Sequence, residues 1–163
     1  MDKQALLDQL KRDEGLRLKP YKCTAGKLTI GFGRNLEDVG ISEQEAELML
    51  MEDIRNVAIE LADNRIYEKL DDARQTVLAN MAFNLGMSRL GKFKKMWAAL
   101  SRQDYQKAAD EMMDSRWARQ VGVRAKRLEA RLSLCAPRPL HEKRQSCLPA
   151  AVCAEKMNLW PGP

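Results

Sequence analysis

Apolar residues recur at the spacing of an α-helix along most of this chain, and one short segment near the N-terminus departs from that spacing. Residues repeated every three or four positions lie on one face of a helix. From residue 67 onward we therefore expect several amphipathic helices around a common core. Three of their apolar faces consist of Val77, Leu78, Met81, Ala82 and Leu85; Phe93, Met96, Trp97 and Leu100; and Tyr105, Ala108, Ala109 and Met112. A chain of 163 residues can bury such a core without disulfide bonds.

The sequence marks both ends of a first helix near the N-terminus. Asp2 is a suitable N-cap, and Gly15 is a natural stop, so the helix should run from about Lys3 to Glu14. Glu14 is the fourth residue after Leu10. We therefore expect its carboxyl group near the apolar face, at the end of the helix.

A capping box predicts a second, longer helix. Ser42 is its N-cap and Glu45 occupies the third helical position. A helix from here to about Ala62 would be roughly 30 Å long, at about 1.5 Å per residue, so it could join two lobes. Its apolar face would consist of Leu48, Met51, Ile54, Ala58 and Leu61.

The segment from Leu16 to Gly33 is the one that departs from helical spacing. Residues 24–26 (Thr-Ala-Gly) favour a turn, and residues 27–33 alternate in polarity and include β-branched and aromatic side chains. This pattern predicts a short β-hairpin or meander. The fold class is therefore α+β: mostly helical, with a small lobe that carries a short sheet, joined by a long helix to a helical lobe.

The charge of the chain indicates anionic partners. Its 28 Lys and Arg residues exceed its 23 Asp and Glu residues, which gives a net charge of +5. Nucleic acid, acidic lipid and anionic cell-wall polymer all suit this charge. The basic segment 116–128 lacks a series of aromatic stacking platforms, which disfavours nucleic acid. No apolar run exceeds five residues, and the N-terminus does not resemble a secretion signal, so we expect accumulation in the cytoplasm.

Cysteine and proline set the last thirty residues apart. The four cysteines are Cys23, Cys135, Cys147 and Cys153; they form no C-x-x-C pair, and the single histidine is His141, so a zinc site is not expected. Residues 133–163 hold five of the six prolines. We expect an irregular tail there, whose thiols are either inert or able to form a disulfide with Cys23 in an oxidising compartment.

One constellation points to chemistry. Glu14, Cys23 and Thr29 follow the spacing E-x8-C-x5-T, in which the first ends a helix, the second opens a turn and the third lies on a strand. A hairpin that folds back on the helix end can bring the three around one cleft. Cleavage of a glycosidic bond needs a protonated acid beside the leaving oxygen and an anionic or nucleophilic group that faces the anomeric carbon.

At these positions the sequence resembles the phage-type lysozymes, glycoside hydrolase family 24. The resemblance covers about residues 5–130. The matching segments are residues 12–19 (RDEGLRLK), 21–26 (YKCTAG), 29–33 (TIGFG), 80–86 (NMAFNLG), 115–117 (SRW) and 124–127 (RAKR).

The resemblance implies a two-lobed lysozyme-like fold and a muramidase that hydrolyses the β-1,4 bond between N-acetylmuramic acid and N-acetylglucosamine in peptidoglycan. Glu14 would be the general acid, Cys23 would take the second catalytic position, and Thr29 would position the water or the glycosyl intermediate. Phe83 would line the glycan cleft, and Arg124 would reach Glu14 across it. No metal and no cofactor are expected. The resemblance further implies a monomeric phage endolysin that stays in the host cytoplasm until a holin gives it access to the wall in the periplasm.

Two positions depart from the commoner family pattern. Many relatives carry Asp where Cys23 stands; the thiol could act as a nucleophile, act as a base or order water, so a retaining or an inverting outcome stays open. The frequent Gly-His after the strand reads Gly33-Arg34 here, and because arginine does not titrate we expect a structural ion pair. Burial would raise the pKa of Glu14, whereas a nearby Arg124 would lower it.

Two other functions remain open at this point. A lytic transglycosylase would use the glutamate alone and release anhydro sugars, and a cationic wall-binding protein would have lost catalysis. The expected organisation is a catalytic domain over residues 1–132 and a tail over 133–163. Within the domain, the small lobe spans about residues 12–60, and the helical lobe comprises about residues 61–132 together with the N-terminal helix.

Overall fold

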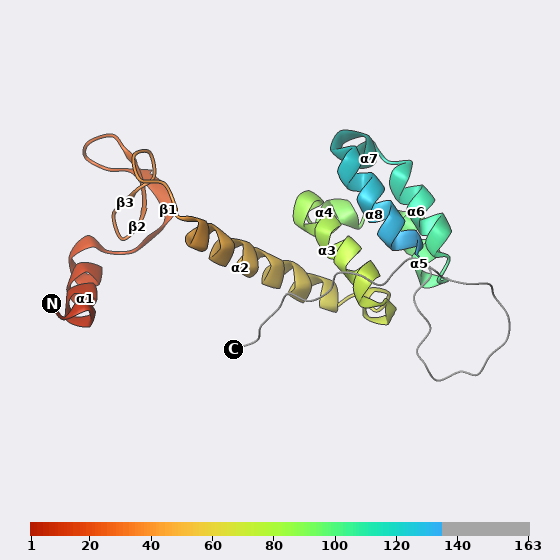
Figure 1. Ribbon diagram of the computed structural model, residues 1–163, viewed down its shortest axis with the longest axis horizontal. Coiled ribbons are helices and arrows are strands. Elements are labelled where there is room, and N and C mark those ends of the chain that lie inside the picture. Colours follow the sequence, from red (N-terminus) through yellow and green to blue (C-terminus); the bar gives the residue numbers. More distant parts are fainter. Residues whose placement is uncertain (135–163) are drawn as a thin grey trace, which may run out of the picture.

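A computed structural model describes residues 1–134 of the chain. A long helix, α2 (Glu43–Ala62), separates a small three-stranded sheet at one end from a bundle of short helices at the other (Figure 1). The predicted α+β class and the linking helix are confirmed. Within the described residues, no helix combines the length and the apolar character that a membrane span requires. The tail predicted over 133–163 lies outside the described residues, apart from its first two.

The sheet is built as the hairpin pattern predicts. It contains β1 (Arg17–Lys22), β2 (Leu28–Gly31) and β3 (Arg34–Asn35), which are antiparallel and lie in that order. Thr29 lies on the central strand, opposite Tyr21 of β1 and Asn35 of β3. A side chain at this position is covered from both sides, and Thr29 is 3% exposed.

Helix α2 begins at the predicted capping box but does not bury the predicted apolar face. The Ser42 hydroxyl accepts from the Glu45 backbone N–H, and the Glu45 carboxylate accepts from the Ser42 N–H. Leu61 is its one buried residue, whereas Leu48 and Met51 are largely exposed. The predicted apolar residues do share one face of the helix, but most of that face is exposed because little packs against the first four turns.

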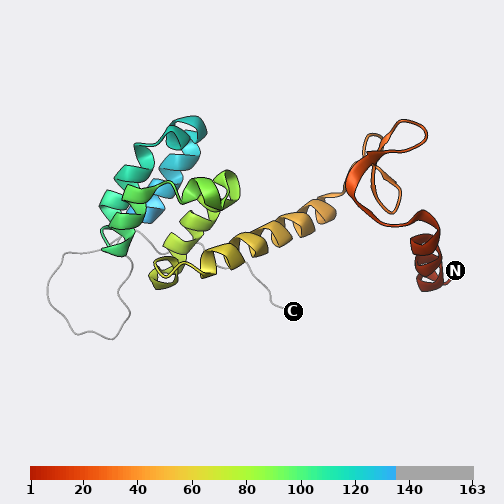
Figure 2. The same ribbon diagram turned by 180° about the vertical axis from the view of Figure 1, so that it is seen from behind.

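Helix α1 (Lys3–Glu14) has the predicted bounds and cap. Asp2 accepts from the backbone N–H groups of Gln4 and Ala5, and Gly15 follows with a φ of +66°. The sequence grouped this helix with the helical lobe. In the structure it lies at the sheet end of α2, far from the bundle, and it has no buried residue (Figures 1 and 2).

The helical lobe holds the hydrophobic core of the described chain. Its elements are η1 (Tyr67–Lys69), α3 (Asp72–Leu85), α4 (Met87–Leu90), α5 (Lys94–Ser101), α6 (Tyr105–Met113), α7 (Arg116–Val121) and α8 (Val123–Ser133). α6 packs between α5 and α8, and α3 packs on α8. The three predicted apolar stripes meet here: Val77, Leu78, Met96, Leu100 and Met112 are each no more than 2% exposed.

One charged side chain is buried within this core. Arg74, at 1% exposure, pairs with Asp71, donates to the carbonyl oxygens of Leu132 and Leu134, and stacks its guanidinium 3.5 Å from the centre of the Tyr105 ring. A buried charge is tolerated only when it is paired and hydrogen-bonded, as it is here. Arg74 thus ties the start of α3 to the end of α8.

Candidate active site

Glu14 is the last residue of α1, and its carboxylate reaches the backbone just after β2. A Cβ atom built at Gly33 would lie 3.1 Å from Oε2 of Glu14. Gly33 has a φ of +78°, a conformation that residues with a side chain rarely adopt. Glycine at this position therefore allows the positive φ of the turn and leaves room for the Glu14 carboxylate. Glu14 itself is exposed, so the burial expected from its place near the apolar face of α1 is not observed.

Cys23 opens the tight turn between β1 and β2. Its backbone N–H donates to the Lys27 carbonyl at 3.0 Å, and its own carbonyl accepts from the Gly26 N–H at 2.8 Å. The residue is half-buried, and within residues 1–134 its thiol has no disulfide partner. The tail cysteines that the sequence offers as possible partners lie outside the described residues. Hydrogen bonds from the backbone of Ala25 and Lys27, and then from the Thr29 side chain, hold the pKa of the Cys23 thiol below its usual value. The turn therefore favours the thiolate, the reactive form of cysteine.

Thr29 shares a partner with Cys23. Its hydroxyl donates to the same Lys27 carbonyl, also at 3.0 Å. A threonine hydroxyl carries one hydrogen, so it can donate either to this carbonyl or to the Cys23 thiolate, but not to both at once. While it donates to the carbonyl, its oxygen lone pairs can accept from a thiol or from a water molecule.

Arg34 forms the ion pair that the sequence predicts at this position. Its guanidinium contacts both carboxylate oxygens of Glu45 at 2.7 and 3.2 Å, and it donates to the Gly40 carbonyl at 3.3 Å. The Ser42 N–H, with Arg34 as a further contributor, lowers the pKa of the Glu45 carboxyl. The pair joins β3 to the first turn of α2.

The two residues predicted from the helical lobe lie apart from the other three. Phe83 is on α3 and is 44% exposed, so it is available to a ligand. Arg124 donates through Nε to the Asn80 side chain at 2.9 Å. The expected reach of Arg124 to Glu14 is not observed, because the sheet and α1 lie at the opposite end of α2 (Figure 2).

The helical lobe also has an open pocket that sequence reasoning missed. It has a volume of about 930 Å³ and is lined by five basic residues and two acidic ones. At its wall, Trp117 packs edge-on against Phe93 and donates to the Asn84 side chain at 2.7 Å. The signal in the sequence is the run of residues 92–97, which contains three lysines, two aromatic residues and a methionine. The basic residues are Arg89, Lys92, Lys94, Lys95 and Arg116.

Comparison of the sequence with known proteins identifies a family. The family model described as phage lysozyme matches residues 11–133. The chain belongs to the phage lysozyme family.

Similar proteins extend over most of the chain. A probable T4-type lysozyme 2 of Dictyostelium discoideum is 32% identical over 155 residues. The match covers 76% of this chain and 91% of that protein. An endolysin of Acyrthosiphon pisum secondary endosymbiont phage 1 is 35% identical over 114 residues, covering 68% of this chain and 75% of that protein. The pre-baseplate central spike protein Gp5 of Enterobacteria phage T4 is 29% identical over 153 residues, covering 76% of this chain and 27% of that protein.

As a phage lysozyme, the chain is a glycoside hydrolase that acts on bacterial peptidoglycan. Residues 1–134 contain no group of three or more His, Cys, Asp or Glu side chains arranged to hold a metal ion.

Proposed function

We propose that this chain is a muramidase endolysin in which Glu14, Cys23 and Thr29 carry the reaction. Glu14 protonates the glycosidic oxygen between N-acetylmuramic acid and N-acetylglucosamine. Cys23 and Thr29 act on the other side of the anomeric carbon, where the thiolate or a water that they order attacks. The proton of that water, or of a second water that releases the intermediate, restores the acid, so one water is consumed for each bond cleaved.

The observation that carries this proposal is the shared Lys27 carbonyl. One acceptor fixes the backbone of Cys23 and the hydroxyl of Thr29, each at 3.0 Å. The backbone that carries the thiol and the Thr29 hydroxyl are thereby held on one carbonyl before substrate arrives, and such positioning is a large part of catalysis. The carboxylate of Glu14 lies against Gly33, two residues beyond the strand that carries Thr29.

The basic pocket of the helical lobe supports peptidoglycan as the substrate. Peptidoglycan carries carboxylates on its peptides, and five cations line this pocket against two carboxylates. The exposed Phe83 and the half-buried Phe93 add apolar surface of the kind on which a sugar ring can rest. Phe83 is therefore proposed to line the glycan cleft, and Arg124 to contribute positive charge from α8.

The biological setting follows from this activity. An endolysin held in the host cytoplasm reaches its substrate after a holin permeabilises the membrane, and it then acts on the wall in the periplasm. We propose that it does so as a monomer. Fractionation of expressing cells with and without a co-expressed holin, together with sedimentation of the purified protein, tests this setting.

Loss of turbidity from purified cell walls tests the reaction itself. Wild type should clear the walls, and Glu14→Gln, which keeps the shape of the side chain but not its acid, should not. Mass analysis of the fragments should show sugars with water added across the cleaved bond. Anhydro sugars would instead indicate a lytic transglycosylase, and retained clearing by Glu14→Gln would indicate lysis by a cationic wall-binding protein.

A further inference from the structure

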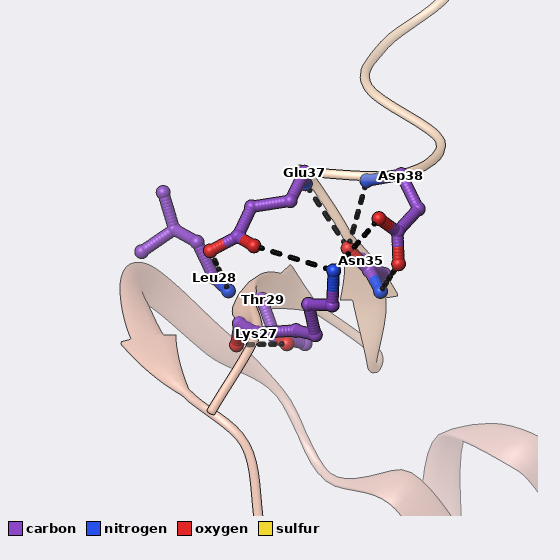
Figure 3. Close-up of polar contacts among 6 residues, drawn as sticks. All are labelled: Lys27, Leu28, Thr29, Asn35, Glu37 and Asp38. Atoms are coloured by element: carbon purple, nitrogen blue, oxygen red, sulfur yellow. Dashed lines mark hydrogen bonds and ion pairs between the residues drawn. The ribbon is translucent and has the colours of Figure 1, made fainter. Parts of the chain in front are cut away.

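A polar cluster beside Lys27 supports the backbone carbonyl that Cys23 and Thr29 share. The cluster comprises Lys27, Asn35, Glu37 and Asp38, together with the Leu28 backbone, and it lies at the edge of the small sheet (Figure 3). Lys27 ends the turn and Leu28 begins β2. Anything that fixes these two residues therefore fixes the direction of the Lys27 carbonyl.

The Glu37 side chain completes the pairing of β2 where β3 ends. β3 pairs with β2 through Asn35, and the Leu36 N–H still donates to the Leu28 carbonyl at 2.8 Å. The chain then turns away, and Oε1 of Glu37 accepts from the Leu28 N–H at 3.0 Å. A carboxylate oxygen thus stands where a strand would have supplied a backbone carbonyl.

Both acidic residues also hold the Lys27 side chain. The Lys27 ammonium lies 3.0 Å from Oδ1 of Asp38 and 3.6 Å from Oε2 of Glu37 (Figure 3). These groups are 42–55% exposed, so each ion pair by itself contributes little to stability. Their effect is local: Glu37 contacts both the side chain of Lys27 and the backbone of the next residue.

Asn35 fixes the direction of the two carboxylates. Its side-chain oxygen accepts from the backbone N–H groups of Glu37 and Asp38 at 3.0 and 3.1 Å, and its amide nitrogen donates to Asp38 at 2.9 Å. This is an Asx turn, in which a side chain replaces a backbone partner. These hydrogen bonds hold the loop in the conformation that presents both carboxylates to Lys27.

We propose that Glu37 is a positioning residue for the reaction, which holds the Lys27 carbonyl so that Cys23 and Thr29 keep their catalytic arrangement. This inference rests on the roles proposed above for Cys23 and Thr29. Glu37 touches neither of them and acts through the backbone of Lys27 and Leu28. Without it, the turn gains freedom and the hydrogen bonds that favour the Cys23 thiolate are made less often.

Three variants separate the parts of this support. Glu37→Ala removes both contacts, whereas Glu37→Gln keeps an oxygen for the Leu28 N–H but loses the charge. Lys27→Met removes the ammonium and leaves the Lys27 carbonyl in place. Glu47→Ala, an exposed carboxylate of α2, is the matched control for the loss of an acidic side chain near the small lobe.

The first readout does not depend on catalysis. The rate at which iodoacetamide alkylates Cys23 follows its thiolate fraction, and peptide mass spectrometry measures this site separately from the other cysteines. For Glu37→Ala we expect alkylation at neutral pH to slow by about three-fold or more, with the profile displaced to higher pH. Glu37→Gln and Lys27→Met should each give a smaller displacement, and Glu47→Ala should give none.

The second readout is the kinetics of wall hydrolysis. Because misplacement of reacting groups lowers turnover more than binding, Glu37→Ala should reduce kcat by about ten-fold with little change in KM. A fall in kcat with an unchanged Cys23 alkylation profile would overturn the proposal, since Glu37 would then act by another route. An unchanged kcat with an altered profile would overturn it as well. If Glu14→Gln still cleared cell walls, the proposed function would fail, while the alkylation profile would still report whether Glu37 supports the turn.

Discussion

The two ends of this molecule hold their shape by different forces. In the helical lobe, eighteen apolar residues are at most 6% exposed and pack into one cluster. Among residues 1–60, Thr29 is the one buried residue, and the sheet is held by backbone pairing, ion pairs and side chains that bond to the backbone. Burial of apolar surface is the larger and less specific force, whereas hydrogen bonds are directional. The lobe with the dry core therefore supplies stability, and the polar lobe supplies placement of reactive groups.

Glu14→Gln should separate these two properties most clearly. Because the side chain is exposed, its replacement should leave the melting temperature close to that of wild type. Loss of the acid should reduce wall hydrolysis by about 10²–10⁴-fold, the range of general acid–base catalysis. Turbidity assays and thermal melts on the same preparations measure both. A large fall in melting temperature would show that Glu14 also supports the fold.

A matched pair of leucines tests where the stability resides. Leu78→Ala opens a cavity in the helical core and should cost about 2–5 kcal/mol. Leu48→Ala, on the exposed face of α2, should change the unfolding free energy by no more than about 0.5 kcal/mol. Urea unfolding compares them directly. An equal cost for both would mean that the face of α2 is covered in solution and that the contrast between the lobes is smaller than the structure shows.

Two substitutions at Cys23 test whether the polar lobe needs a particular atom or only a charge. Cys23→Asp should keep substantial activity, because a carboxylate can also act as base or nucleophile. Cys23→Ala should lose about 100-fold, since it leaves neither. Initial rates of wall hydrolysis distinguish them. Equal activity in the two variants would exclude a catalytic role for the thiol.

The Glu45 carboxylate, which accepts from the Ser42 N–H and pairs with Arg34, should give the smallest effect and the clearest dependence on pH. The pKa of Glu45 is lowered below its usual 4.5, so the folded state favours the carboxylate. The resulting stabilisation is present above the ordinary pKa and is lost as the pH falls through the lowered one. Glu45→Gln should therefore melt slightly below wild type at neutral pH, and the difference should shrink as the pH falls below the ordinary 4.5. A constant difference across this range would assign the effect to packing.

Sequence periodicity predicted the helices better than it predicted their packing. The three stripes of the helical lobe are buried as expected because each faces another stripe. The faces of α1 and α2 have equally regular spacing, yet Leu10 and Leu48 are exposed. Spacing shows that a helix has an apolar side, but it does not show whether another element reaches that side.

In the candidate site, too, local features could be predicted from the sequence and contacts between distant residues could not. The hairpin pattern placed Cys23 on a turn and Thr29 on a strand, because turn and strand signals are local. The charge of Arg34 predicted an ion pair without naming Glu45. The support from Glu37 could not be predicted, since it depends on which side chain meets the Leu28 N–H once a two-residue strand has ended.

Arg74 fixes the C-terminal end of α8, where the chain leaves the helical lobe. Its guanidinium, which comes from 60 residues earlier, binds the carbonyl of Leu134 and thereby closes the last turn of the bundle from within. Together with its bond to the Leu132 carbonyl, this contact anchors the end of α8 to the start of α3. A label or a binding module joined after residue 134 would therefore start from a helix end that a buried side chain already holds in place.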